Sequence, residues 1–187
     1  PIIFIHGTFS EPGTFSGDFK NNIHKSIKIS TPYTKAVSEF QWTGGNNDDA
    51  RTAAVTEISN TLNSDLSKQL LQKLNHPKHI ILVCHSHGGN VAKKVKNIFE
   101  LLDSGWIVDV INIENPQRAD YQFNSSNGKI LNFWSDGDFV QWLGSVADFD
   151  LSQPNSGPSG SRKDPKANNI QLLSIPRITT EQYGQGM

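Results

Sequence analysis

The feature of this sequence that most limits its fold is an apolar run that passes directly into a glycine-containing turn and then into a helical pattern. Residues 79–84 (HIILVC) are almost continuously apolar and rich in β-branched side chains, which is typical of a strand buried on both faces of a parallel sheet. After the turn at residues 85–89 (HSHGG), apolar residues recur at helical spacing from Asn90 to Leu102. This order of strand, sharp turn and helix predicts an α/β fold with a mostly parallel sheet.

The rest of the chain repeats this alternation. Apolar runs predict further strands at residues 2–5, 37–42, 106–113, 129–134 and 170–175, and helical spacing predicts helices over residues 19–27 and 49–74. Residues 43–47 form a turn whose asparagines suit a helix N-cap. Residues 153–169, rich in Pro, Ser, Gly and Asn, predict an exposed, mobile loop or lid. We expect one domain over residues 1–187, with helices on both faces of the sheet.

The charge and cysteine content exclude several classes of protein. Seventeen basic and 18 acidic side chains give a net charge of −1, which removes the main attraction to nucleic acid. The single cysteine, Cys84, excludes an intrachain disulfide and a multi-cysteine zinc site. No apolar run reaches the roughly 18 residues that span a bilayer. We expect a soluble chain, and the cysteine count does not distinguish a cytoplasmic from a secreted protein.

Ser86 lies in the turn at a position suited to acyl-transfer chemistry. That chemistry needs a hydroxyl within reach of a base, and backbone N–H groups that stabilise the oxyanion. A strained turn between a strand and a helix provides both. The residues two before and two after the serine must then be small, because their side chains face each other across the turn. Here they are Cys84 and Gly88. The pattern predicts that Ser86 is a nucleophile.

Residues 84–90 (CHSHGGN) resemble the nucleophile elbow of the α/β-hydrolase superfamily, particularly of its lipase-like members. Residues 3–8 (IFIHGT) are similar to the strand and His-Gly turn that carry the oxyanion hole in bacterial lipases and esterases. Residues 40–44 (FQWTG), which precede a long predicted helix, are also similar to lipase-like hydrolases. The resemblance implies an α/β-hydrolase fold with the backbone N–H groups of Thr8 and His87 as oxyanion donors.

The resemblance also implies a catalytic acid and a histidine that follow the serine in this order. Residues 137–140 (GDFV) come after the predicted strand at 129–134 and fit the acid loop of the family, so Asp138 is the expected acid and Asp136 the second choice. All six histidines lie at or before position 87, and none follows Asp138. We expect the catalytic histidine in a C-terminal segment beyond Met187, and the alternative is a protein without a standard triad.

Other polar residues have plainer interpretations. His85 and His87 flank Ser86, but side chains at i and i+2 across a tight turn point in different directions, so we expect no metal site. The four aspartates between residues 136 and 150 match no calcium loop and indicate a solvated acidic loop. We expect Cys84 to be an inert buried residue and His6 to be a structural residue that supports the oxyanion loop.

These features predict a serine hydrolase that cleaves carboxylic esters through an acyl-enzyme on Ser86, without a cofactor. We expect a lipase, esterase or phospholipase whose partner is a small-molecule or lipid ester, with transient contact to a lipid surface. The alternatives are a binding module on a hydrolase scaffold without its base, a thioesterase, acyltransferase or amidase, and the lipase-like domain of a larger bacterial secreted or toxin protein. The sequence contains no motif that indicates the length of the acyl chain, the alcohol of the ester or the oligomeric state.

Overall fold

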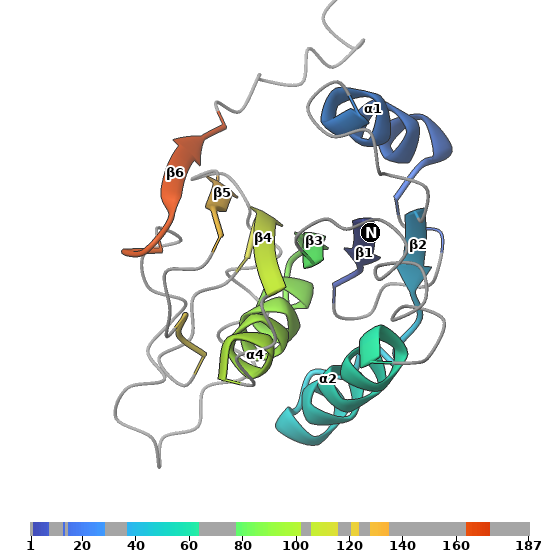
Figure 1. Cartoon of the computed structure of the whole chain (residues 1–187), viewed down its shortest axis with the longest axis vertical. Coiled ribbons are helices and arrows are strands. Elements are labelled where there is room, and N and C mark those ends of the chain that lie inside the picture. Colours follow the sequence, from blue (N-terminus) through green and yellow to red (C-terminus); the bar gives the residue numbers. More distant parts are fainter. Residues whose placement is uncertain are drawn as a thin grey trace, which may run out of the picture.

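The computed structural model describes residues 2–7, 13, 15–28, 37–63, 78–101, 106–115, 121–123, 128–134 and 164–172. Six strands in these residues form one all-parallel sheet in the order β2-β1-β3-β4-β5-β6 (Figure 1). The strands are β1 (Ile2–Ile5), β2 (Val37–Phe40), β3 (Lys78–His85), β4 (Trp106–Ile113), β5 (Ile130–Trp134) and β6 (Asn168–Gln171), and the helices are α1 (Gly17–Lys28), α2 (Asp48–Asn63) and α4 (Gly88–Leu101). The predicted α/β class with a parallel sheet is confirmed.

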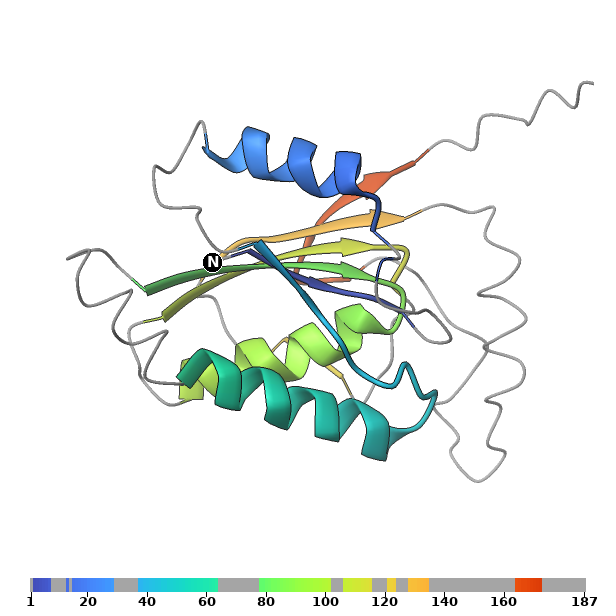
Figure 2. The same cartoon turned by 90° about the vertical axis from the view of Figure 1, so that its right-hand side faces the viewer.

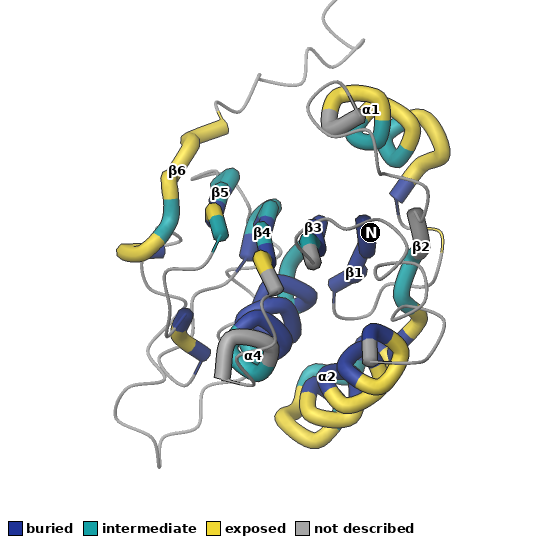
Figure 3. The backbone as a smooth tube through the Cα atoms, in the orientation of Figure 1, coloured by how far each residue is buried: buried dark blue, intermediate teal, exposed yellow. Residues whose placement is uncertain are grey.

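Helices cover both faces of the sheet. Figure 2 shows α1 on one face and α2 and α4 on the other. Because successive side chains of a strand point to opposite faces, β1 contributes Ile2 and Phe4 to the apolar cluster under α1, and Ile3 and Ile5 to the larger cluster under α2 and α4. β1 is buried along its whole length, whereas the outer side of α2 is exposed (Figure 3). None of the described helices is long and apolar enough to cross a membrane.

The strand order changes direction between β1 and β3. From β1 the chain continues to β2 on one side, and it then returns to β3 on the other side of β1. As a result α1, which follows β1, and α4, which follows β3, lie on opposite faces (Figure 2). Open parallel sheets bind ligands outside the carboxyl ends of the strands at such a switch point. The topology alone therefore predicts a ligand-binding site at the carboxyl ends of β1 and β3.

The predicted elements agree with the observed ones except near the end of the described chain. The helix predicted over residues 49–74 is α2 as far as Asn63, and its remainder lies outside the described residues. Of the loop predicted at 153–169, residues 153–163 also lie outside them. The predicted exposure is wrong for Asp164, which is 1% exposed. Residues 168–169 are exposed as predicted but belong to β6, which begins two residues before the strand predicted at 170–175 and ends at Gln171. The reason is a set of side-chain contacts that holds this segment against the sheet and α4.

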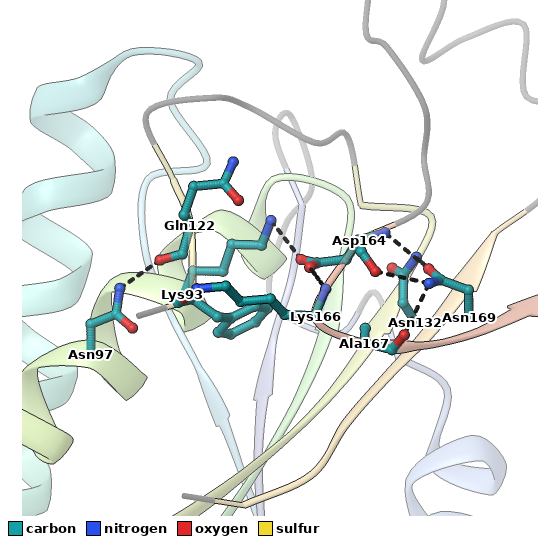
Figure 4. Close-up of polar contacts among 9 residues, drawn as sticks. Lys93, Asn97, Gln122, Asn132, Asp164, Lys166, Ala167 and Asn169 are labelled. Atoms are coloured by element: carbon teal, nitrogen blue, oxygen red, sulfur yellow. Dashed lines mark hydrogen bonds and ion pairs between the residues drawn. The ribbon is translucent and has the colours of Figure 1, made fainter. Parts of the chain in front are cut away.

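Asp164 makes a buried ion pair with Lys93 of α4. Lys93 Nζ lies 3.1 Å from Asp164 Oδ2, and the two side chains are 0% and 1% exposed. The Lys93 ammonium also lies 5.3 Å from the centre of the Phe123 ring. Asn169 joins Asp164 to the sheet: its amide bonds the backbone N–H and carbonyl of Asp164, and its Oδ1 accepts from Asn132 of β5 at 2.8 Å (Figure 4). This network anchors β6 and the turn before it.

Removing one partner of the buried ion pair should lower the free energy of unfolding much more than removing both partners. We expect Lys93→Met to lower the free energy of unfolding by about 3–5 kcal/mol, because Asp164 is left as an uncompensated buried charge. The double variant Lys93→Met/Asp164→Leu should recover most of this loss. Urea denaturation followed by circular dichroism measures both changes.

Lys94→Met is the matched control on the same helix. Its partner Asp48, 3.0 Å away, is 63% exposed, and exposed pairs contribute about 0.2–1 kcal/mol. A Lys93→Met protein that is as stable as the Lys94→Met protein would contradict the prediction.

Candidate active site

Ser86 occupies a sharp, strained turn between β3 and α4. Its backbone φ is +52°, a left-handed conformation that costs a residue with a Cβ roughly 1–2 kcal/mol. The Ser86 N–H donates to the carbonyl of Ile113 in β4 at 2.9 Å, and the Ser86 carbonyl accepts the N–H of Gly89 at 2.9 Å. The predicted order of strand, turn and helix is present, and hydrogen bonds on both sides hold the turn.

Two glycines allow the end of β1 to touch this turn. A Cβ at Gly7 would lie 2.7 Å from Ser86 Cβ, and a Cβ at Gly88 would lie 2.4 Å from the carbonyl oxygen of Ile5. Real Cβ atoms do not approach this closely, so both positions need glycine. From the sequence, the small residue at 88 is expected because it faces Cys84 across the turn. The nearest atoms are instead the backbone carbonyls of the neighbouring strand, so that reason was wrong although glycine is required.

One of the two predicted oxyanion donors lies in the described part of the chain. The backbone N–H of His87 directly precedes the first residue of α4, at the positive end of the helix dipole. Asn90 Nδ2 lies 3.3 Å from His87 Nδ1, so the two side chains are in contact beside the turn. Thr8 lies outside the described residues. Its neighbour Gly7 lies directly against Ser86.

His6 supports the end of β1. Its ring is buried and stacked on Trp42, with ring centres 5.6 Å apart. Nδ1 lies 2.9 Å from the Gly7 carbonyl, to which it donates, and Trp42 Nε1 donates to the His6 carbonyl at 3.0 Å. These contacts agree with a structural role, because they hold Gly7 against the turn.

Cys84 is fully buried in β3. Burial raises the pKa of its thiol well above the ordinary value, since a thiolate would lose its hydration there. The thiol therefore stays protonated, in agreement with the prediction of an inert residue.

Both acid candidates, Asp138 and Asp136, lie outside the described residues. The strand that precedes them, β5, ends at Trp134 on the same edge of the sheet as Ser86, with β4 between the two. Within the described ranges, no three His, Cys, Asp or Glu side chains come together in a group that could hold a metal ion.

A second strained residue on this edge was not predicted from the sequence. Glu114 follows β4 as Ser86 follows β3, and its φ is also +52°. Its N–H donates to the Phe133 carbonyl of β5 at 2.8 Å, just as the Ser86 N–H donates to β4. Glutamate has no special tendency toward positive φ, so the sequence carries no signal for this turn. Two successive strands therefore end in the same strained conformation.

Glu39 of β2 fastens a segment that consists of Gly13 and the first turn of α1. Its Oε1 accepts the N–H of Gly13 at 2.8 Å, and its Oε2 pairs with Lys20 Nζ of α1 at 2.8 Å. Burial alone would raise the pKa of Glu39, but the Lys20 ammonium and the Gly13 N–H outweigh burial and lower the pKa below the ordinary 4.5. The ionised carboxylate thus contributes to holding this segment.

Comparison with protein-family models and with curated proteins finds no match to this chain. The chemistry of the site therefore has to be inferred from its own geometry: a strained serine, a helix N-terminus beside it, and the glycine-lined contact with β1.

Replacing Ser86 with glycine should stabilise the protein. Glycine adopts φ +52° without the Cβ penalty but loses more backbone entropy on folding, so we expect Ser86→Gly to gain about 1 kcal/mol. In a chain of this size that gain raises Tm by about 2–4 °C. Ser86→Ala keeps the Cβ and is the matched control. Differential scanning calorimetry measures Tm of both variants. If Tm of Ser86→Gly is no higher than Tm of Ser86→Ala, the backbone of Ser86 is not strained.

The lowered pKa of Glu39 makes part of the stability depend on pH. Ionised Glu39 stabilises the fold above its unfolded pKa near 4.5, and this contribution is lost as the pH falls through the lower folded pKa. We expect Glu39→Gln to be less stable at neutral pH and to lose less stability than wild type on acidification below about pH 5. Glu57→Gln, at an exposed position of α2, is the control. Urea denaturation at a series of pH values from 7 downward gives the free energy of unfolding of both proteins. If it falls equally in wild type and in Glu39→Gln as the pH is lowered, this expectation is contradicted.

Proposed function

We propose that this protein is a serine hydrolase of the α/β-hydrolase fold that cleaves carboxylic esters, with Ser86 as the nucleophile. The observation that carries the proposal is the left-handed Ser86 between β3 and α4, in contact with Gly7 at the switch point of the sheet. An ordinary serine at a helix N-terminus needs no such strain. Strain of this kind persists where a reacting group must be held in one position.

In the proposed reaction, Ser86 Oγ attacks the acyl carbonyl carbon and the alcohol leaves, giving an acyl-enzyme that water hydrolyses. The oxyanion accepts hydrogen bonds from the backbone N–H groups of His87 and Thr8. One such donor contributes about 2.7–4 kcal/mol of transition-state stabilisation. The position of His87 at the N-terminus of α4 adds the favourable end of the helix dipole. This mechanism needs no cofactor.

The proton of Ser86 requires a base. The resemblance to lipase-like hydrolases implies a histidine after the acid, and no histidine follows Asp138 in the sequence. We assign the acid that orients this histidine to Asp138 or, failing that, to Asp136. The same constellation serves thioesterases, acyltransferases and amidases, and we favour a lipid-type ester because the resemblance is to lipase-like members.

The second candidate function is a binding module on the same scaffold. It applies where no base reaches Ser86, because a serine without its base keeps only residual activity. A site at the switch point could then hold an ester or acid without cleaving it.

A fluorophosphonate probe and p-nitrophenyl butyrate, used on the full-length natural protein, separate the two candidates. We expect the probe to label wild type, and Ser86→Ala to lose labelling and to lower kcat by a factor on the order of 10⁴ or more. Ser26→Ala, at an exposed position of α1, should behave as wild type. Wild type that is neither labelled nor active would favour the binding module, and hydrolysis that survives Ser86→Ala would overturn the assignment of Ser86.

A further inference from the structure

Trp42 holds His6 by two separate contacts. The indole Nε1–H of Trp42 donates to the His6 carbonyl at 3.0 Å, and the two rings are stacked with their centres 5.6 Å apart and their planes at 25°. Both residues are buried, at 8% and 0% exposure. One side chain therefore fixes both the backbone and the ring of the residue that directly follows β1.

The indole donates at the place where the pairing of β1 with β2 ends. The last pair in the register of these two strands is Ile5 with Phe40. Trp42 lies two residues beyond Phe40, and its side chain donates to the first carbonyl beyond β1. A hydrogen bond from a side chain can be removed by a single substitution, whereas one between two backbones cannot. The placement of His6 thus depends on the identity of one residue.

The His6 carbonyl also lies against the helix that follows the nucleophile turn. A Cβ at Gly88, the first residue of α4, would lie 2.6 Å from this oxygen. β1 lies between β2 and β3 (Figure 1), so Trp42 reaches the end of β1 from the β2 side, and Ser86 and Gly88 reach it from the β3 side. The end of β1 is therefore held from both neighbouring strands.

The contact between the His6 ring and Gly7 fixes the direction of a peptide group. His6 Nδ1 donates to the Gly7 carbonyl at 2.9 Å. A trans peptide group is planar, and its C=O and N–H point in opposite directions. The N–H in the same peptide group as the Gly7 carbonyl is that of Thr8. A ring that binds this carbonyl therefore directs the Thr8 N–H away from itself.

We propose that Trp42 is a positioning residue of the active site, which acts through His6 to direct the Thr8 N–H toward the oxyanion. The inference rests on the proposed ester hydrolysis, in which Thr8 is an oxyanion donor. A Cβ at Gly7 would lie 2.7 Å from Ser86 Cβ, so a peptide group that begins at Gly7 is adjacent to the nucleophile. A donor that is already oriented stabilises the transition state without reorganisation during the reaction.

Trp42→Phe in the full-length natural protein tests this role, because phenylalanine keeps an aromatic ring beside His6 and removes the Nε1–H donor. We expect kcat for p-nitrophenyl butyrate to fall by about 10–100-fold and KM to change by less than about threefold, since the oxyanion forms only in the transition state. Tyr121→Phe is the matched control. It removes a hydroxyl that accepts from Arg51 Nε at 3.0 Å from an equally buried aromatic ring, and it should keep the wild-type kcat.

A fall in kcat that is no larger in Trp42→Phe than in Tyr121→Phe would show that Trp42 only fills the core, and would overturn the inference. A raised KM with an unchanged kcat would overturn it as well. If Trp42→Phe does not fold, benzothienylalanine at position 42 is used in its place, because it keeps the shape of the indole and lacks the N–H.

A double variant tests whether Trp42 acts through His6. His6→Ala removes the ring that binds the Gly7 carbonyl, and we expect it to lower kcat at least as much as Trp42→Phe. Trp42→Phe/His6→Ala should then have the kcat of His6→Ala within about threefold, because the link to Gly7 is already missing and coupled residues are not additive. Effects that multiply in the double variant would show that Trp42 acts without His6, and would overturn the inference.

Residual dipolar couplings report the direction of each backbone N–H group without catalysis. We expect the coupling of Thr8 to change in Trp42→Phe and to keep its wild-type value in Tyr121→Phe. An unchanged Thr8 coupling in Trp42→Phe would overturn the inference. If wild type neither hydrolyses the ester nor reacts with the fluorophosphonate probe, the proposed function is refuted. The Thr8 coupling then decides by itself whether Trp42 sets the direction of this peptide group.

Discussion

The contact between the end of β1 and the turn after β3 is the constraint on which the rest of the site depends. Gly7 lies against Ser86 and Gly88 lies against the last carbonyls of β1, and neither position has room for a Cβ. The contact exists because β1 and β3 are neighbours at the point where the strand order changes direction. α1 and α4 leave this point on opposite faces of the sheet (Figure 2).

The unfavourable features of the described chain are concentrated on this one edge. Ser86 and Glu114 hold left-handed backbone that costs roughly 1–2 kcal/mol each, and the amides of Asn112 and Asn115 are buried without partners among the described residues. The two apolar clusters on either side of the sheet offset such costs. Local rules of stability are broken most often where a fold carries function, and two strained residues lie on the carboxyl edge at the ends of β3 and β4.

Features with a local signal could be predicted from the sequence, and features that depend on distant partners could not. Continuous apolar runs predicted β1 and β3, and the asparagines before α2 predicted its cap, where the Ala50 N–H donates to Asn47 Oδ1 at 2.8 Å. The sharp turn at Ser86 could be predicted because its strand, glycine turn and helix are contiguous. Lys93 gave no sign of burial, because its partner Asp164 is far along the chain. Glu114 gave none either, since nothing about glutamate indicates a left-handed turn.

The end of β4 connects the nucleophile turn to the strand that precedes the proposed acid. The Ser86 N–H donates to Ile113 in β4, and the next residue, Glu114, donates to Phe133 in β5. Ile113 and Glu114 are adjacent in the chain, so these two hydrogen bonds connect β3, β4 and β5 at their carboxyl ends. A displacement of Phe133 in β5 would therefore be transmitted through Glu114 and Ile113 to Ser86. Asp138 follows β5 by only a few residues. In the proposed hydrolase, these backbone hydrogen bonds thus hold the nucleophile turn in register with the strand that precedes the acid.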